Sequence, residues 1–134
     1  MPAELDLHVV TRVDDFTVDV KLSAPVGVTV LFGPSGAGKS TVLRAIAGLV
    51  PLHAGHVRFD GADWSQTPPE RRAVGYVFQH AALFPHLSVM QNLDYGRRMN
   101  RLARDAAEET RIVNLLDIGH LLSRRTGKLS GGER

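Results

Sequence analysis

The nine residues 33–41, with the sequence GPSGAGKST, constrain the fold of this chain more than any other segment. They fit the pattern GxxxxGK followed by Ser or Thr, in which a strand, a loop and a helix follow one another directly. The preceding run VTVLF at 28–32 is apolar and rich in β-branched residues, as in a strand buried on both faces. After the loop, Val42 and Ile46 recur at helical spacing and predict a helix over 39–49. The chain therefore has to build an α/β unit around this loop.

The residue types in this loop predict that it wraps phosphate groups. Glycines let backbone N–H groups approach a dense anion, and a helix that begins near Lys39 directs its free N–H groups and positive dipole end at the same anion. We expect Lys39 to reach the β- and γ-phosphates of a nucleotide, the Ser40 hydroxyl to ligate Mg²⁺, and Thr41 to help hold the α-phosphate. The expected nucleotide contacts are Gly33, Pro34, Ser35, Gly36, Ala37, Gly38, Lys39, Ser40 and Thr41.

Composition supports a globular domain and excludes several classes of protein. Of the 134 residues 43% are hydrophobic and 22% charged, which argues against disorder, and the absence of cysteine excludes disulfides and thiolate metal sites. The formal net charge is only +2 and the basic residues are scattered, so we expect no nucleic-acid partner. The pairs Arg71-Arg72 and Glu108-Glu109 predict solvated faces. We find neither a membrane-span pattern nor a secretory-signal pattern, so any membrane role is expected to run through a partner.

Apolar alternation predicts further strands before and after the phosphate loop. Residues 5–9 and 16–22 alternate with period two, which predicts two strands that each bury one face. A short strand is expected at 57–59, and residues 74–78 predict another core strand. The segments 28–32 and 74–78 are then expected to belong to a parallel core sheet, in which strands are covered on both faces.

The pattern changes to helical after Pro85. Residues 89–99 and 104–116 carry apolar stripes that predict two helices. We therefore expect residues 1–84 to form the β-subdomain and the start of the core sheet, with the phosphate loop inside it. Residues 85–134 are expected to form a helical subdomain.

Two further segments carry a resemblance to a known family. Residues 129–134 read LSGGER, and residues 75–79 read GYVFQ. A Ser-Gly-Gly turn alone would predict only a helix cap. Together with the phosphate loop it resembles the LSGGQ or LSGGE signature of the ATP-binding-cassette (ABC) ATPases, and 75–79 looks like the Q-loop of that family. The resemblance covers the whole chain. Among importers it is most similar to the molybdate type, through VTVLFGPSGAGKST, RRAVGYVFQHAALFPHLSV and NLDYG, much of which sulfate, iron and sugar importers share.

The resemblance implies that the signature completes a nucleotide site in a second subunit. In the family two cassettes pack head to tail, and the signature of one covers the ATP held by the phosphate loop of the other. Carried over to this chain, Ser130 supplies a hydroxyl to the γ-phosphate, and Gly131 and Gly132 add backbone N–H donors.

The resemblance also implies a role for Gln79 and an aromatic contact to the base. In the family the Q-loop glutamine contacts Mg²⁺ and the attacking water, and its loop lies where the membrane subunit docks. Lys39 and Gln79 are thus the expected catalytic residues, and Ser40 and Gln79 the expected metal contacts. The family stacks an aromatic residue on adenine, and Phe16 is the available one, although its alternation with Val18 fits a core residue equally well.

The function that the resemblance implies is that of a P-loop ATPase of the ABC type with ATP and Mg²⁺ as cofactors. It implies an ATP-binding subunit of an importer, which couples ATP binding and hydrolysis to solute uptake, of molybdate or a similar oxyanion. The implied partners are a second copy, in a head-to-tail homodimer, and a transmembrane permease, at the cytoplasmic face of the cell membrane. The alternatives are a soluble non-transport ABC ATPase, or a fragment that only binds nucleotide.

The family motifs expected after the signature do not occur in this sequence. They comprise an apolar strand that ends in Asp and Glu, which order Mg²⁺ and polarise the attacking water, and later a histidine switch. We therefore expect a fragment that lacks the C-terminal core strands and the hydrolytic residues. As written, the chain is expected to turn over ATP poorly or not at all.

Overall fold

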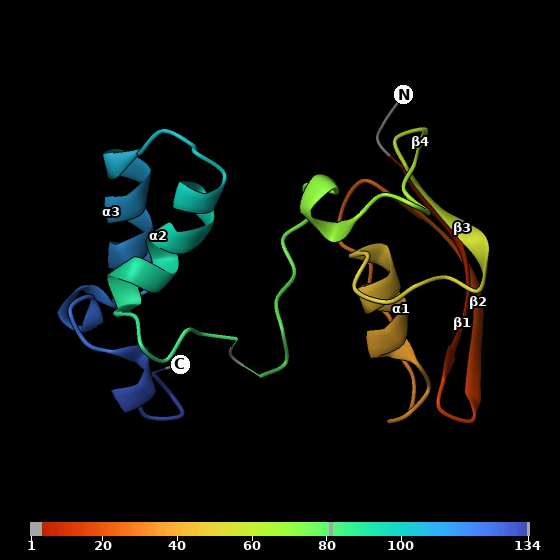
Figure 1. The fold of residues 1–134 in the computed structure, drawn as a ribbon, viewed down its shortest axis with the longest axis horizontal. Helices are drawn as coiled ribbons and strands as arrows, with labels where there is room; N and C mark the ends of the chain where they lie inside the picture. The colour runs from red at the N-terminus through yellow and green to blue at the C-terminus, as the bar shows by residue number, and fades with distance from the viewer. Residues whose placement is uncertain (1–3, 81, 134) are drawn as a thin grey trace. The chain divides into compact units, whose positions relative to one another are not determined.

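The structure, a computed structural model, describes residues 4–80 and 82–133 of the chain. The residues divide into two compact units, Met1–Tyr76 and Val77–Arg134. Figure 1 shows the strands and helix α1 in the first unit, and helices α2 and α3 in the second. The division falls between Tyr76 and Val77, and the subdomain boundary expected at Pro85 stays a prediction.

The first unit is built on a four-stranded antiparallel sheet in the order β2-β1-β3-β4. β1 and β2 form a hairpin that turns through Asp14, whose φ of 52° an aspartate tolerates better than most residues. Leu7, Val9 and Val57 have at most 1% of their surface exposed and form the centre of the core. The strands are β1 (Glu4–Val13), β2 (Phe16–Pro25), β3 (Ala54–Phe59) and β4 (Ala62–Asp63). The strands expected from alternation at 5–9 and 16–22 are confirmed.

One helix, α1 (Lys39–Ile46), covers this core. Its buried residues are Val42 and Ala45, and Ala45 belongs to the same cluster as Leu7 and Val57. The helix ends three residues before the expected position 49. Its end is set by Gly48, whose φ of 76° is left-handed and stops the helical path.

The parallel core sheet expected from the sequence is not formed among the described residues. All pairings between the described strands are antiparallel, and neither 28–32 nor 74–78 is a strand. Val28, Val30 and Phe32 have 95%, 77% and 99% of their surface exposed. A strand buried on both faces needs hydrogen-bonded neighbours and a layer on each face, and the described residues supply neither to 28–32. The α/β class is confirmed, whereas the two expected core strands are corrected to segments without regular secondary structure.

The second unit contains two α-helices followed by two short 3₁₀ turns. They are α2 (Val89–Met99), α3 (Ala106–Leu115), η2 (Gly119–Leu121) and η3 (Thr126–Lys128). α2 begins with a capping box, in which Gln91 N–H donates to the Ser88 hydroxyl at 3.1 Å and Ser88 N–H donates to the Gln91 side chain at 2.9 Å. A small core of Val89, Leu121 and Leu129 lies beneath it. Both expected helices are confirmed.

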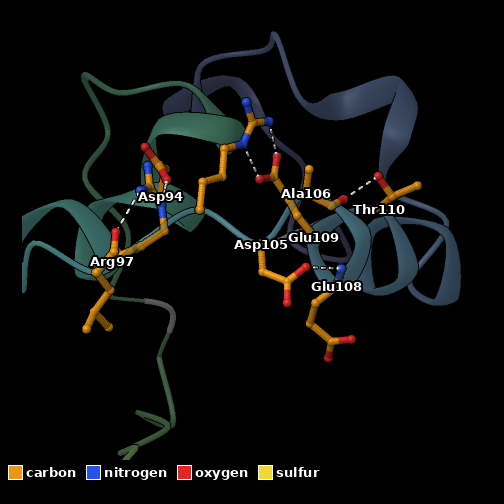
Figure 2. Close-up of polar contacts among 9 residues, drawn as sticks. Asp94, Arg97, Asp105, Ala106, Glu108, Glu109 and Thr110 are labelled. Atoms are coloured by element: carbon orange, nitrogen blue, oxygen red, sulfur yellow. Dashed lines mark hydrogen bonds and ion pairs between the residues drawn. The ribbon is translucent and has the colours of Figure 1, made fainter.

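Ion pairs and caps organise the surface of α2 and α3 (Figure 2). Asp105 caps α3 by accepting the Glu108 N–H at 3.0 Å, and Glu109 binds the Arg104 guanidinium through two contacts of 2.9 Å. The Arg104 hydrogen bond lowers the pKa of Glu109. Glu108 is exposed, as expected, whereas Glu109 is half-buried beside Arg104. Ion pairs near the surface add little to stability. Within the described ranges, no helix is long and apolar enough to cross a membrane.

Candidate nucleotide-binding site

The phosphate loop leads into α1 through two glycines with left-handed backbone. Gly36 and Gly38 have φ values of 82° and 88°, and Gly38 is the N-cap residue of α1. No side chain caps the first turn, which also contains no acidic residue. The first N–H groups of α1 are therefore left for another acceptor, and together with the helix dipole they favour an anion.

Gly38 has a steric reason to be glycine as well as a conformational one. A Cβ at this position would lie 2.8 Å from Val18 Cγ2 and 3.6 Å from Phe16 Cε1. β2 thus presses against the start of α1, and any side chain at position 38 would force the loop away from the strand. The alternating pattern of β2 signalled a buried Val18, but its contact with the loop could not be read from the sequence.

Phe16 lies beside the loop at the start of β2. Its ring edge faces Gly38, and 51% of its surface is exposed. Exposure on this scale is unusual for a core aromatic, so the structure favours a surface role over core packing. Phe16 thus presents a partly exposed aromatic ring next to the first turn of α1.

Lys39 holds the loop closed through its own backbone. The Lys39 Nζ donates to Gly33 O at 2.8 Å and to Pro34 O at 2.6 Å, while Ala37 N–H donates to Pro34 O at 3.3 Å. Lys39 takes part in none of the described ion pairs. An ammonium held only by neutral carbonyls gains from exchange for a phosphate, because charge-assisted hydrogen bonds are about twice as strong as neutral ones.

The remaining residues of the loop lie where the motif requires them. Ser40 and Thr41 are in the first turn of α1, and the Ser40 side chain is exposed. A hydroxyl at this point suits Mg²⁺, which prefers oxygen ligands and keeps several waters. The donor set of the loop therefore fits a magnesium-bound polyphosphate: backbone N–H groups, one ammonium and one hydroxyl.

Gln79 and the signature lie in the second unit. Gln79 is exposed in a bend after the segment 74–78. Its expected contacts to Mg²⁺ and water stay predictions, as do the roles of Ser130, Gly131 and Gly132.

The signature serine already binds an anion within its own unit. Ser130 donates through its N–H and its hydroxyl to one oxygen of Glu133, at 2.8 and 2.7 Å. The other Glu133 oxygen lies 3.2 Å from Arg124 Nη1, and the Ser130 bonds lower the pKa of Glu133. The two donors thus converge on a single carboxylate oxygen, in a local contact between residues three apart. Glu133 is not among the site residues expected from the sequence, although Ser-x-x-Glu, the pattern of a capping box, is a signal for this contact. Arg134 of the signature segment lies outside the described residues.

Comparison with known proteins relates this geometry to a family. The family model described as ABC transporter matches residues 17–134. The chain is 53% identical over 128 residues to the molybdenum import ATP-binding protein ModC of Rhodobacter capsulatus, covering 92% of this chain and 35% of that protein. It is 48% identical over 144 residues to ModC 1 of Azotobacter vinelandii, covering 100% of this chain and 39% of that protein. The chain thus spans little more than a third of the length of these relatives.

Solved structures agree with the sequence comparison. A nucleotide-free ATP-binding cassette from an ABC transporter shares a TM-score of 0.72 and 25% identity, covering 99% of this chain and 61% of that one. A second ATP-binding cassette of an ABC transporter gives a TM-score of 0.74 at 26% identity, with the same coverage. The family model and the relatives, taken with the phosphate loop, lead to one conclusion: this chain belongs to the ABC transporter family.

Proposed function

We propose that this chain binds ATP with Mg²⁺ as part of an import ATPase that drives uptake of molybdate or a similar oxyanion. The observation that carries the proposal is the first turn of α1, which has no side-chain cap, has Gly38 in a left-handed conformation and begins with Lys39. The names of the relatives, molybdenum import ATP-binding proteins, support the direction of transport and the solute.

The residues of the loop have distinct tasks in this proposal. Lys39 exchanges Gly33 O and Pro34 O for the β- and γ-phosphate oxygens, while the N–H groups of the loop and of α1 surround the same phosphates. Ser40 and Gln79 hold Mg²⁺, which when bound neutralises charge on the phosphates. Phe16, half-exposed beside Gly38, offers a flat apolar face to the adenine.

The signature acts on a nucleotide held by a second copy of the chain. Ser130 already directs two donors at one carboxylate oxygen, which supports its proposed contact to a γ-phosphate. Gly131 and Gly132 are exposed, and a Cβ added at either would meet no atom within 4 Å, so their backbone is accessible to a partner. A head-to-tail dimer of this kind, bound to a membrane permease on its cytoplasmic face, is the assembly that we propose.

Nucleotide binding is tested by titrating the 134-residue chain with a fluorescent ATP analogue in the presence of Mg²⁺. We expect saturable binding that is lost in Lys39→Ala, because the ammonium is the only full positive charge that the loop itself supplies. Lys21→Ala, which removes an exposed lysine from β2, is the matched control and should bind as the parent chain does. Equal affinity of the parent chain and Lys39→Ala would contradict the proposal.

A further inference from the structure

Arg72 is a buried arginine in the first unit, against the expectation of a solvated Arg71-Arg72 pair. It follows the 3₁₀ turn η1 (Pro69–Arg71), and only 5% of its surface is exposed, whereas Arg71 is exposed. Its guanidinium donates to three backbone carbonyls. Nε binds Thr67 O at 2.7 Å, and Nη1 binds Ala45 O at 2.8 Å and Ile46 O at 2.9 Å.

Two of these carbonyls belong to the last turn of α1. The last C=O groups of a helix have no partner within the helix, and the C-terminal end carries the negative pole of the dipole. Ala45 O also accepts the Gly48 N–H at 3.1 Å, so Arg72 adds a charged donor to that carbonyl and binds Ile46 O as well, at the negative end of the helix. None of the described ion pairs includes Arg72, and burial lowers the pKa of its guanidinium, which remains charged because the pKa of arginine is so high.

Gly48 makes room for this guanidinium. A Cβ at position 48 would lie 2.7 Å from Arg72 Nε and 2.8 Å from Arg72 Cζ, and the φ of Gly48 is 76°. The left-handed turn that ends α1 therefore opens the space that Arg72 fills. Gly48 and Arg72 are distant in sequence, and both residue types are needed for this one contact. This points to a role for the contact beyond filling space in the core.

The contact fixes the direction of a short helix. α1 has eight residues, so it is only about 12 Å long at 1.5 Å per residue. Lys39 and the first N–H groups lie at one end of this rigid rod, and the carbonyls bound by Arg72 lie at the other. Holding the last turn against Thr67 O thus sets where the first turn points.

We propose that Arg72 is a positioning residue for the triphosphate: by clamping the C-terminal carbonyls of α1 it aims the N-terminal N–H groups and Lys39 at the phosphates. The inference rests on the proposed nucleotide binding. Arg72 itself touches no part of the expected nucleotide contacts. A buried charge is a costly way to stabilise a core, and an apolar residue of similar size often serves stability as well. A positioning role explains why this site has an arginine, whose planar guanidinium binds several carbonyls in a fixed geometry.

The test compares Mg²⁺-dependent binding of the fluorescent ATP analogue to the whole chain and to Arg72→Ala, Arg71→Ala and Lys39→Ala. We expect Arg72→Ala to bind about tenfold more weakly, since small displacements of binding groups cost this much or more. Arg71→Ala should bind as the parent chain does. About 20 mM guanidinium chloride, far below denaturing concentrations, should restore affinity to Arg72→Ala by refilling the site, whereas an equal concentration of sodium chloride should not.

Restored affinity would show that a guanidinium is needed at this place, and urea unfolding followed by Trp64 fluorescence separates positioning from stability. Arg72→Ala should be fully folded under the conditions of the binding assay, and an unfolded fraction large enough to account for its weaker binding would overturn the inference. Unchanged affinity of Arg72→Ala would overturn it as well.

Should Arg72→Ala fail to fold by circular dichroism, Arg72→Lys takes its place. It keeps the charge without the fork, and it must bind several-fold more weakly for the inference to stand. If the parent chain binds no better than Lys39→Ala, the proposed function fails first and the inference fails with it.

Discussion

At the scale of single residues, the site depends on contacts that sequence patterns describe only in part. The motif at 33–41 identified the loop because its glycine spacing is local. It gave no indication that Val18 on β2 packs against Gly38, or that Arg72 clamps the far end of α1. Both contacts join segments distant in sequence, and an arginine beside another arginine resembles a surface pair until its carbonyl partners are known.

Replacing Gly38 with alanine should destabilise the first unit. The new Cβ would lie 2.8 Å from Val18 Cγ2, and the residue would have to adopt a φ of 88°. We expect a loss of about 2 to 4 kcal/mol in the free energy of unfolding, from backbone strain and overpacking together. Urea unfolding followed by Trp64 fluorescence measures it, because Trp64 is the only tryptophan and packs against the core of this unit.

Gly36→Ala is the matched control for this prediction. Gly36 has a similar φ of 82°, but a Cβ there would meet no atom within 4 Å. It should therefore show the strain without the collision, a loss of about 1 kcal/mol. Equal losses in the two variants would mean that the contact with Val18 is unimportant.

At the scale of elements, the local signals succeeded and the non-local ones failed. α2 and α3 were predicted because the apolar residues that define helical periodicity lie within a few residues of each other. The strands β1 and β2 were predicted for the same reason, whereas their pairing in a hairpin was not. The expected strands at 28–32 and 74–78 depended on neighbours elsewhere in a sheet. An apolar run indicates that its side chains need to be buried, but it does not indicate whether the described residues supply the strands and helices that would bury them.

The capping box of α2 gives a prediction at this scale. Ser88→Ala removes the hydroxyl that accepts the Gln91 N–H, and the loss of such a cap costs about 1 kcal/mol. Hydrogen exchange of the Gln91 and Asn92 amides should therefore become about fivefold faster, since this factor corresponds to about 1 kcal/mol at room temperature. Exchange in α3, which has its own cap at Asp105, should change far less, and an equal acceleration there would contradict a local effect.

At the scale of the whole molecule, an apolar segment beside the phosphate loop lies open to solvent. Val28, Val30 and Phe32 are each at least 77% exposed, and soluble monomers rarely leave contiguous apolar surface of this kind uncovered. An apolar segment that is rich in β-branched residues and not paired in a sheet also offers a template for pairing with other chains.

We expect the 134-residue chain to self-associate through this segment. Val30→Lys should lower the fraction of associated chain, because a charge on an apolar edge opposes its pairing. Light scattering over a range of protein concentrations measures this fraction. Thr29→Lys introduces the same charge at a neighbouring exposed position without removing an apolar side chain. It should have the smaller effect, and the reverse order would show that association uses another surface.

The hold of Lys39 on Gly33 O and Pro34 O has a consequence for how quickly a ligand is accepted. A loop that is already held in one conformation by its own hydrogen bonds need not fold around the ligand. Binding then exchanges the carbonyl oxygens on the Lys39 ammonium for ligand oxygens, and the loop loses little conformational entropy. The loop should therefore bind its ligand in a single kinetic phase, with an association rate set by diffusional encounter and not by a conformational change of the chain.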